Sequence, residues 1–501
     1  MKRVTLLLLF LLASGCTSIP RAWPAVPSST TPIGGTEGDR EAITLALTGD
    51  VMLGRDVDAM ILENGPLYPW GDLLPLLQTA DLLLINLESV IAEGGEPFQP
   101  PRVFYLRADP KAIEVLTRAG VDYVTLSNNH TMDFQEPALL ETIHHLDEYG
   151  IAHAGAGADI EEASRFAMLE ARGIRVGVVA FADHYEEYAA TEDSAGTNVI
   201  SISVEGPHFS RVERAIDAVR AAGADLVVFS IHWGPNMRHV PPPEFREFAR
   251  AVIDAGADIF HGHSAHVFQG IEIYEGKPIL YDTGDLIDDY YAFEQHRNDQ
   301  QLLFLITATG SGVEGIELVP VLISNSQVNV ADVTAFDQIY HRIRDLSAAM
   351  GTEVRREGDR LVIDVSAPPA PVTSLPAYLE RVSPAPGTRR SVKGESLLLR
   401  VDVLADGMRA ADEELSRQEV ILRNVLIYDG VVMQWQGYAD DGGWMVGDAE
   451  GSQVYRVAPS LYQVFWSAPC EPGLHEVTHI LHSGSGEVLE YTWYFELAVE
   501  D

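Results

Sequence analysis

The stretch "ITLALTGD" (residues 43–50) sets the pattern from which the fold is predicted. It is a run of aliphatic and β-branched residues that ends in a carboxylate, Asp50. Such continuous apolar runs are typical of strands that are buried on both faces of a sheet. The pattern returns along the chain in "DLLLINLE" (81–88), "DYVTLSNNH" (122–130), "RVGVVAFADH" (175–184), "DLVVFSIHWG" (225–234), "ADIFHGHSAH" (257–266) and "PILYDTGD" (278–285).

Amphipathic stretches such as "PKAIEVLTRAG" (110–120) separate several of these runs. The alternation predicts an α/β layer architecture. Ligands of open α/β sheets bind beyond the carboxyl ends of the strands, so polar residues at these ends should converge on one edge. The strand-end residues of ligand type are Asp50, Glu88, Asn129, His130, Asp183, His184, His232, His263, His266, Asp282 and Asp285.

These residues form a mixed set of oxygen and nitrogen ligands, which suits Mn, Fe, Zn or Co. Ligands spread over many strands could hold one or two divalent ions, and a pair would lie about 3.5–4 Å apart. The net charge of −40, from 34 basic and 74 acidic residues, argues against nucleic acid as a partner, because phosphate backbones require basic surfaces.

The N-terminus has the form of an export signal. "MKR" precedes the apolar stretch "VTLLLLFLLA" (4–13), and "LASGC" (12–16) resembles a bacterial lipobox. We expect residues 1–16 to be a lipoprotein signal peptide, with acylation of Cys16 anchoring the exported chain to the membrane on its extracytoplasmic side. An ordinary cleaved signal peptide and an uncleaved anchor are the alternatives. The only other cysteine is Cys470, so no intramolecular disulfide is expected in the mature chain.

Composition divides the remaining chain. Residues 17–41 are rich in Pro, Ser, Thr and Gly and predict a flexible linker. Residues 42–366 carry the α/β pattern, and residues 367–378 are a Pro-rich linker. In residues 379–501 short alternating runs separated by turn signals predict a smaller all-β sandwich of immunoglobulin-like pattern.

Five segments resemble the CapA family of poly-γ-glutamate capsule synthesis proteins in order and spacing. They are "LTGDVMLGR" (47–55), "LINLE" (84–88), "YVTLSNNHTMDF" (123–134), "IHWGPNM" (231–237) and "GHSAHVFQGIEIYEGKPILYDTGDLIDDY" (262–290). The resemblance covers roughly residues 42–366. It places the chain in the metallophosphatase superfamily and implies a four-layer α/β/β/α sandwich with metals above the strand ends.

The resemblance also implies roles for single residues. Asp50 would bridge two ions, His130 would be the proton donor, and the remaining metal ligands would be Glu88, Asn129, His232, His263 and His266. The chain departs from the superfamily pattern at Met52, which replaces a ligand, and at Ser264, which replaces a histidine that capsule-family members commonly carry. We therefore expect a weakened first metal site, and both a single-metal site and a metal site without turnover stay open.

Neighbouring residues carry further hypotheses. Arg55 could grip a phosphate or carboxylate in bidentate fashion, or could be a surface residue. Asp133 could orient His130, or could satisfy free N–H groups at a helix N-terminus. Asp285 is expected to support the metal ligands from behind them. The remaining expectations are that Asp288 and Asp289 are solvated and that His261 is structural and points to the opposite face of its strand.

Three functions follow as hypotheses. The first is an exported, lipid-anchored metal-dependent hydrolase of a phosphoester or related bond in an anionic small molecule or envelope polymer. The second is a non-catalytic metal-binding component of anionic polymer synthesis, export or anchoring. The third is a wall-associated binding protein that acts through its β module.

Overall fold

The computed structural model describes residues 42–293, 296–348 and 350–366, and between residues 379 and 499 it describes individual strands by their backbone. The predictions for the signal peptide, Cys16, Cys470 and both linkers lie outside these residues. Across the described part of the chain, no helix has both the length and the apolar character needed to cross a bilayer.

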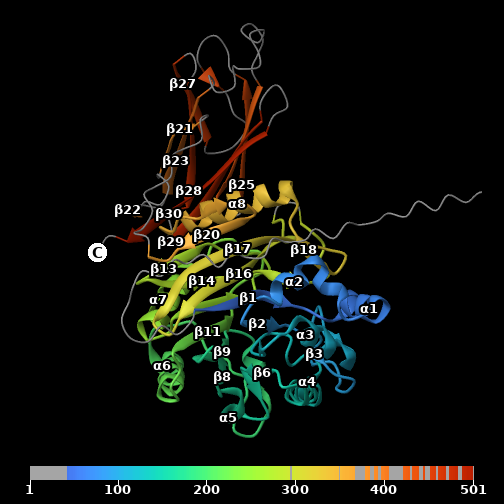
Figure 1. Ribbon diagram of the computed structural model, residues 1–501. Helices are drawn as coiled ribbons and strands as arrows, with labels where there is room; N and C mark the ends of the chain where they lie inside the picture. The colour runs from blue at the N-terminus through green and yellow to red at the C-terminus, as the bar shows by residue number, and fades with distance from the viewer. Residues whose placement is uncertain are drawn as a thin grey trace, which may run out of the picture. The chain divides into compact units, whose positions relative to one another are not determined.

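Residues 42–366 contain two large sheets. The larger has the strand order β19-β20-β17-β16-β1-β2-β5-β6, of which β20, β17, β16, β1 and β2 can be followed in Figure 1. Strands β1, β2, β5 and β6 are mutually parallel, whereas β16 and β17 continue the sheet in antiparallel fashion. Two strands attach to its sides, β15 to β1 and β18 to β17. The bounds are β1 (Ile43–Val51), β2 (Leu82–Leu87), β5 (Tyr123–Thr125), β6 (Ala152–Ala154), β15 (Asp285–Ile287), β16 (Gln300–Thr309), β17 (Gly312–Ser324), β18 (Gln327–Val330), β19 (Arg355–Glu357) and β20 (Arg360–Asp364).

The second sheet has the order β13-β14-β12-β11-β9-β8, and its four central strands, β9, β11, β12 and β14, are parallel. Its bounds are β8 (Ala167–Ala171), β9 (Ile174–Ala182), β11 (Leu226–His232), β12 (Ile259–His263), β13 (Ile271–Tyr274) and β14 (Lys277–Leu280). Two short strand pairs lie outside both sheets: β3 (Val90–Ile91) with β4 (Arg107–Ala108), and β7 (Ala156–Gly157) with β10 (Gly196–Thr197).

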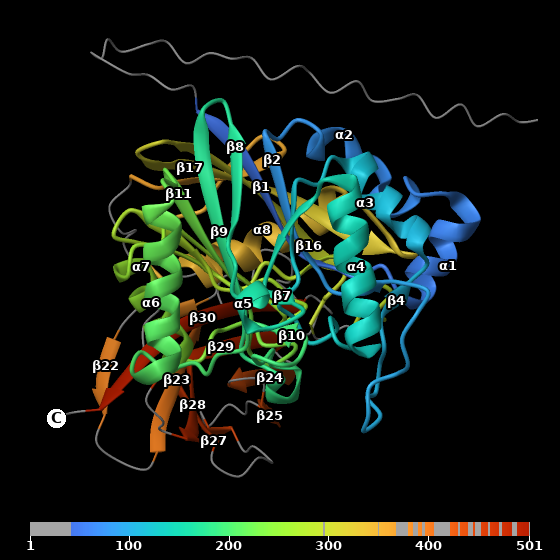
Figure 2. The same ribbon diagram turned by 90° about the horizontal axis from the view of Figure 1, so that it is seen from below.

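Helices lie on the outer faces of the two sheets, with α3 and α4 on one side and α6 and α7 on the other (Figure 2). The helices are α1 (Arg55–Asn64), α2 (Leu74–Leu77), α3 (Ile113–Ala119), α4 (Gln135–Tyr149), α5 (Ile160–Ala163), α6 (Gly206–Ala221), α7 (Pro243–Asp254) and α8 (Val333–Ala348), with 3₁₀ turns η1 (Tyr68–Leu73), η2 (Pro110–Ala112) and η3 (Glu186–Tyr188). The α/β class predicted from the sequence is confirmed.

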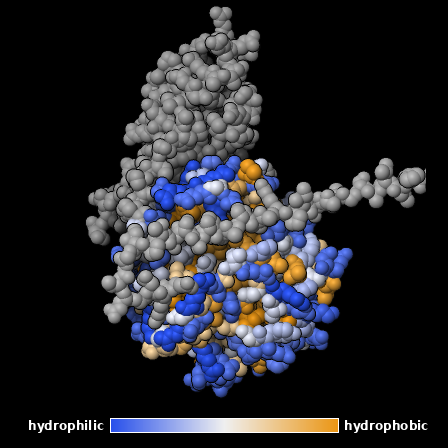
Figure 3. Space-filling model, in the orientation of Figure 1, coloured by the Kyte–Doolittle hydropathy of each residue, from blue (hydrophilic) through white to orange (hydrophobic). Residues whose placement is uncertain are grey.

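The side chains of β1 show how the core is divided. Ile43, Leu45 and Leu47 belong to a core that also contains the strands of the second sheet, whereas Ala46 belongs to a core shared with α1, α3 and α4. Val51 joins this other core as well, because the strand register shifts after Leu47. Alternate residues of a strand face opposite sides of the sheet, so one apolar run serves both cores. Each fully buried aliphatic side chain contributes roughly 1.5–3 kcal/mol to folding. The outer surface seen in Figure 3 is mostly hydrophilic, with smaller apolar patches.

Between residues 379 and 499 the described strands form two five-stranded sheets, with the orders β21-β23-β28-β27-β26 and β22-β30-β29-β24-β25. Their bounds are β21 (Leu379–Ser383), β22 (Arg389–Val392), β23 (Ser396–Leu404), β24 (Ile421–Tyr428), β25 (Val431–Tyr438), β26 (Trp444–Met445), β27 (Ser452–Ala458), β28 (Leu461–Pro469), β29 (Gly473–His482) and β30 (Val488–Val499). The immunoglobulin-like pattern of this region stays a prediction.

Strand β1 approaches β15 so closely that only glycine fits at position 49. A Cβ atom on Gly49 would lie 1.9 Å from the carbonyl oxygen of Gly284 and 2.8 Å from that of Thr283. The next residue, Asp50, donates its backbone N–H to Gly284 O at 2.8 Å. This close approach holds Asp50 beside Asp285, its register partner on β15.

We predict that Gly49→Ala lowers the free energy of unfolding by about 2 kcal/mol or more, because the new methyl group must displace backbone atoms. Thermal unfolding followed by circular dichroism measures the change. Gly315→Ala is the matched control, since the nearest atom to its added Cβ is 3.9 Å away. Equal melting temperatures for the two variants would contradict the prediction.

Candidate metal centre

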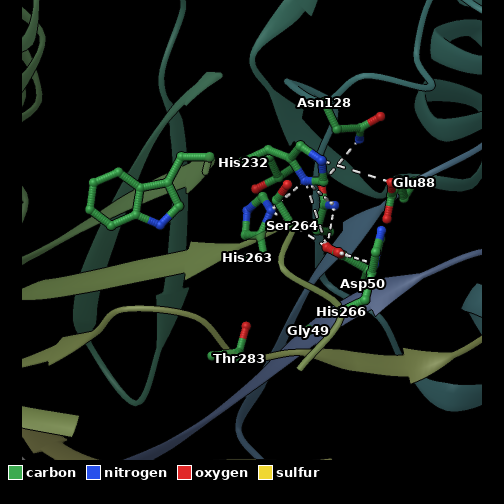
Figure 4. A network of polar contacts seen from close by, with 12 residues as sticks. Gly49, Asp50, Glu88, Asn128, His232, His263, Ser264, His266 and Thr283 are labelled. Carbon is green, nitrogen blue, oxygen red and sulfur yellow. Dashed lines mark hydrogen bonds and ion pairs between the residues drawn. The ribbon is translucent and has the colours of Figure 1, made fainter. Parts of the chain in front are cut away.

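The ligand-type residues meet where the parallel strands of both sheets end. Register places them there: Asp50 is paired with Asn86 on β2 and with Asp285 on β15, and His232 is paired with His263 across β11 and β12. Figure 4 shows the side chains of His232, His263, Asp50 and Glu88 gathered in one network. Asp50, Glu88, His263 and Asp285 have no exposed surface.

A first group of possible ligands consists of Asp50, His232 and His263, whose ligand atoms all lie within 4.8 Å of one another. Asp50 Oδ1 is 3.6 Å from His263 Nδ1 and 3.8 Å from His232 Nδ1. Burial lowers the pKa of His263 to about 3 and that of His232 well below its usual value. Both imidazoles are therefore neutral near pH 7, the form that binds a metal.

A second group consists of Asp50, Glu88, His266 and Asp285, and it satisfies the same distance limit of 4.8 Å. His266 Nδ1 lies 3.0 Å from Asp285 Oδ1 and 3.5 Å from Asp50 Oδ2. Ser264 and His266 have positive φ angles of 119° and 58°, which bends the loop so that His263 and His266 face different oxygens of Asp50. Asp50 is common to both groups.

The electrostatics of the second group fit a divalent cation. Both oxygens of Glu88, Oδ2 of Asp50 and Oδ2 of Asp285 are buried and lack a hydrogen-bond partner. Burial and the nearby Asp50 carboxylate raise the pKa of Glu88 well above its usual value, and burial also raises that of Asp285. Burial opposes ionisation of Asp50 as well, but the neighbouring imidazoles, His266 foremost, lower its pKa. Uncompensated buried carboxylates are costly, and a bound cation removes that cost.

His130 lies beside this cluster, on the segment between β5 and α4 that also carries Asn129. His130 Nδ1 is 2.6 Å from Asp133 Oδ2, and His130 Nε2 is 3.7 Å from Glu88 Oε1. Asn129 Oδ1 is buried without a hydrogen-bond partner, so it is free to accept a further interaction. Asp133 also accepts the backbone N–H of Leu106 at 2.6 Å. These contacts match the orienting role proposed for Asp133 rather than a helix cap, since the N-cap of α4, Phe134, has no side-chain capping bond.

Arg55 does not point into the site as a free cation. Its guanidinium forms an ion pair with Asp289, and it lies 4.9 Å from the ring centroid of Phe104 and 5.2 Å from that of Tyr290. The expectation that Asp288 and Asp289 are solvated is wrong. Asp288 is 3% exposed and accepts the backbone N–H of Tyr290 at 2.7 Å, because the chain after β15 folds back over the cluster.

The structure also corrects the orientation predicted for His261. His261 and His263 are two residues apart on β12, so both rings project from the same face, with centroids 5.3 Å apart. His261 Nε2 lies 2.9 Å from the carbonyl oxygen of Thr48 on β1. The ring therefore links the two sheets, which is the structural role expected of it.

Sequence reasoning missed a layer of amides and hydroxyls behind the ligands. Asn86 donates to Asp50 Oδ1 at 2.7 Å and lies 3.3 Å from His232 Nδ1, while Asn128 donates to Asn86 Oδ1 at 3.1 Å. Ser230 Oγ lies 3.1 Å from His263 Nε2. The period of a strand could have revealed two of them, because Asn86 is two residues before Glu88 and Ser230 is two residues before His232.

Comparison with known proteins finds similarity to a family of bacterial capsule synthesis proteins. The family described as "Bacterial capsule synthesis protein PGA_cap" matches residues 44–290. A probable polyglutamine synthesis accessory protein of Mycobacterium tuberculosis is 33% identical over 368 residues, which cover 65% of this chain and 96% of that protein. The capsule biosynthesis protein CapA of Bacillus anthracis is 29% identical over 254 residues, covering 50% of this chain and 61% of that protein.

Among solved structures, protein TT1561 of Thermus thermophilus is 13% identical, with 54% of this chain and 100% of that chain covered. Its TM-score of 0.30 is too low to support an argument. The matched residues 44–290 contain Asp50, His232, His263 and the other residues of the two ligand groups. Together with the similarity to the mycobacterial protein along nearly its whole length, this match shows that the chain belongs to the bacterial capsule synthesis protein family PGA_cap.

Proposed function

We propose that this protein is a metallophosphatase-like hydrolase that cleaves a phosphoester or related bond in the metabolism of the cell envelope or of a capsular polymer. The observation that carries the proposal is the pair of buried ligand groups that share Asp50. One group holds one carboxylate and two imidazoles, and the other holds three carboxylates and one imidazole. This mixture suits Mn, Fe, Zn or Co.

The chain's own residues have distinct parts in such a reaction. Bound divalent ions would polarise a phosphoryl oxygen and lower the pKa of a bound water molecule. Asp50, His232 and His263 would hold one ion, and Asp50, Glu88, His266 and Asp285 would hold the other. Asn129, whose buried Oδ1 has no hydrogen-bond partner, is proposed as a further ligand. The proposal thus makes Asp285 a metal ligand, whereas the sequence predicted that it only supports the ligands.

His130 is placed to act as a general acid. Asp133 lies at hydrogen-bond distance from its Nδ1, so Nε2 is left to face the cluster, 3.7 Å from Glu88 Oε1. A carboxylate that fixes the orientation of an imidazole and stabilises its protonated form favours proton transfer through the opposite nitrogen. We assign to His130 the protonation of the leaving group.

The location of the reaction is part of the proposal. Acylation of Cys16 would anchor the protein to the membrane on its extracytoplasmic side, where envelope polymers or their anionic precursors are the substrates within reach. The names of the relatives favour a second candidate, because they refer to polyglutamine synthesis and to capsule biosynthesis. In that candidate the same metal centre is non-catalytic and serves the synthesis, export or anchoring of an anionic polymer.

Metal binding should stabilise the folded protein, because the ions offset repulsion among buried carboxylates. We predict that Mn²⁺ at about 100 times its dissociation constant adds roughly 2.7 kcal/mol to the free energy of unfolding. Asp50→Asn should abolish this gain, whereas Asp193→Asn, at an exposed acid, should preserve it. Differential scanning calorimetry with and without Mn²⁺ measures this stabilisation. If Mn²⁺ stabilises Asp50→Asn as much as the wild type, the ion does not bind at the proposed centre.

Substitution of His130 should separate chemistry from metal binding. We predict that His130→Ala lowers turnover by roughly 10²–10⁴-fold while the bound metal stays nearly constant, as expected for loss of a general acid. His232→Ala should lose metal and activity together, since a ligand is removed. Metal per chain by mass spectrometry and hydrolysis of an accepted phosphoester are measured on the same samples.

Two results would revise the assignment. Equal rates in wild type and His130→Ala would exclude His130 from the mechanism. If a fully metallated wild type hydrolyses nothing across a broad panel of phosphomonoesters and phosphodiesters, the non-catalytic candidate replaces the hydrolase.

A further inference from the structure

Two of the ligand histidines each touch an aromatic ring that belongs to a loop above the metal centre. The ring centroid of His232 is 5.5 Å from that of His184, and the centroid of His266 is 5.1 Å from that of Tyr290. The metal centre is therefore bordered on two sides by ring-bearing side chains, none of which is among its ligand groups.

On the first side, the ring of Tyr185 lies 5.3 Å from that of His184, and the guanidinium of Arg102 lies 4.2 Å from the centroid of Tyr185. On the second side, Phe104 and Tyr290 have centroids 6.5 Å apart, and Arg55 lies over both rings. Arg102 and Phe104 are two residues apart, so one loop joins the two sides. We call the resulting border the aromatic rim; it consists of Arg55, Arg102, Phe104, His184, Tyr185 and Tyr290.

The basic side chains of the aromatic rim already lie against acids. Arg55 is paired with Asp289, Arg102 with Glu187, and His184 with Asp183. A polyanion would therefore find little free positive charge on the rim, and the chain as a whole carries a net charge of −40. What the rim offers to solvent is aromatic surface, since Phe104 is 49% exposed and Tyr185 is 37% exposed. Ligand sites are lined mainly by apolar and aromatic side chains, so exposed rings beside a metal centre can contact a bound ligand.

The angles between the rings favour one kind of ligand. His184 and Tyr185 are inclined at 76°, and Phe104 and Tyr290 at 60°, so neither pair forms a parallel slot for a flat base. A pyranose ring presents axial C–H bonds to a single aromatic face, and such bonds meet the negative face of the ring favourably. Its hydroxyl groups point outward, where the carboxylates of Asp289 and Glu187 can accept hydrogen bonds.

We propose that the aromatic rim binds a pyranose ring whose phosphoester group reaches the metal centre, so that the substrate is a sugar phosphate or the phosphate-linked end of a glycan. This inference rests on the proposed function, because it supplies the substrate class for the same centre. The rim selects the substrate through the sugar, and the ligands and His130 act on the phosphoester.

The test compares glucose 1-phosphate with glycerol 1-phosphate, two hydroxyl-bearing phosphomonoesters of which only the first has a ring, using the Mn²⁺-loaded full chain. We expect Tyr185→Ala and Phe104→Ala to lower kcat/KM for glucose 1-phosphate about tenfold more than for glycerol 1-phosphate, mainly through KM. Tyr185→Phe, which keeps the ring, should restore the preference. Leu67→Ala is the control, because Leu67 lies outside the rim and is 49% exposed. It should leave kcat/KM unchanged for both substrates.

Equal losses for both substrates would overturn the inference and leave the hydrolase proposal standing. If Tyr185→Ala and Phe104→Ala lower kcat/KM more for adenosine monophosphate than for glucose 1-phosphate, the rim binds nucleobases. That result would also overturn the inference. If the wild type hydrolyses none of the three, the broad substrate panel decides the hydrolase proposal, and saturation-transfer difference NMR with maltose tests the rim separately. A maltose signal that falls in Tyr185→Ala and persists in Leu67→Ala supports the inference, and an absent or unaffected signal contradicts it.

Discussion

The burial of the Asp50 carboxylate is the constraint around which the rest of the structure is arranged. It has no exposed surface, yet both of its oxygens face polar neighbours that come from different strands of the two sheets. A buried carboxylate persists only where hydrogen bonds, cationic partners or a metal offset the loss of hydration. The amide of Asn86 and the imidazoles of His263 and His266 supply part of that compensation, and the unpartnered oxygens nearby leave room for a cation.

The two-sheet architecture makes such a convergence possible because it brings two sets of parallel strands to one edge. The larger sheet contributes Asp50 and the residue after β2, Glu88, while the second sheet contributes His232 and His263. Residues on rigid strands hold a metal with little freedom of movement. His261 ties the sheets together just below this edge through the carbonyl oxygen of Thr48, so the ligands of the two sheets keep their relative positions.

The aromatic rim is built differently from the metal centre. Its residues lie at the start of α1, on the segment from 97 to 106, on the residues that follow β9 and on those that follow β15, not within the strands themselves. Loops change in sequence more readily than the scaffold that carries them. The loops proposed to select the substrate can therefore change in sequence while the strands that carry the ligand groups stay the same.

The sequence by itself determined the α/β class, the strands that carry the ligand-type residues, and the family, because apolar runs and spaced motifs are local features that survive without a structure. It did not determine what surrounds each side chain. The pairing of Arg55 with Asp289 joins residues 234 positions apart, and the contacts of Asn86 with His232 span 146. Contacts between distant loops and sheets also set the face to which His261 points and the burial of Asp288. They likewise bring the residues of the aromatic rim together. Only the tertiary structure decides these, because a side chain's partners are set by packing across the fold and not by its neighbours along the chain.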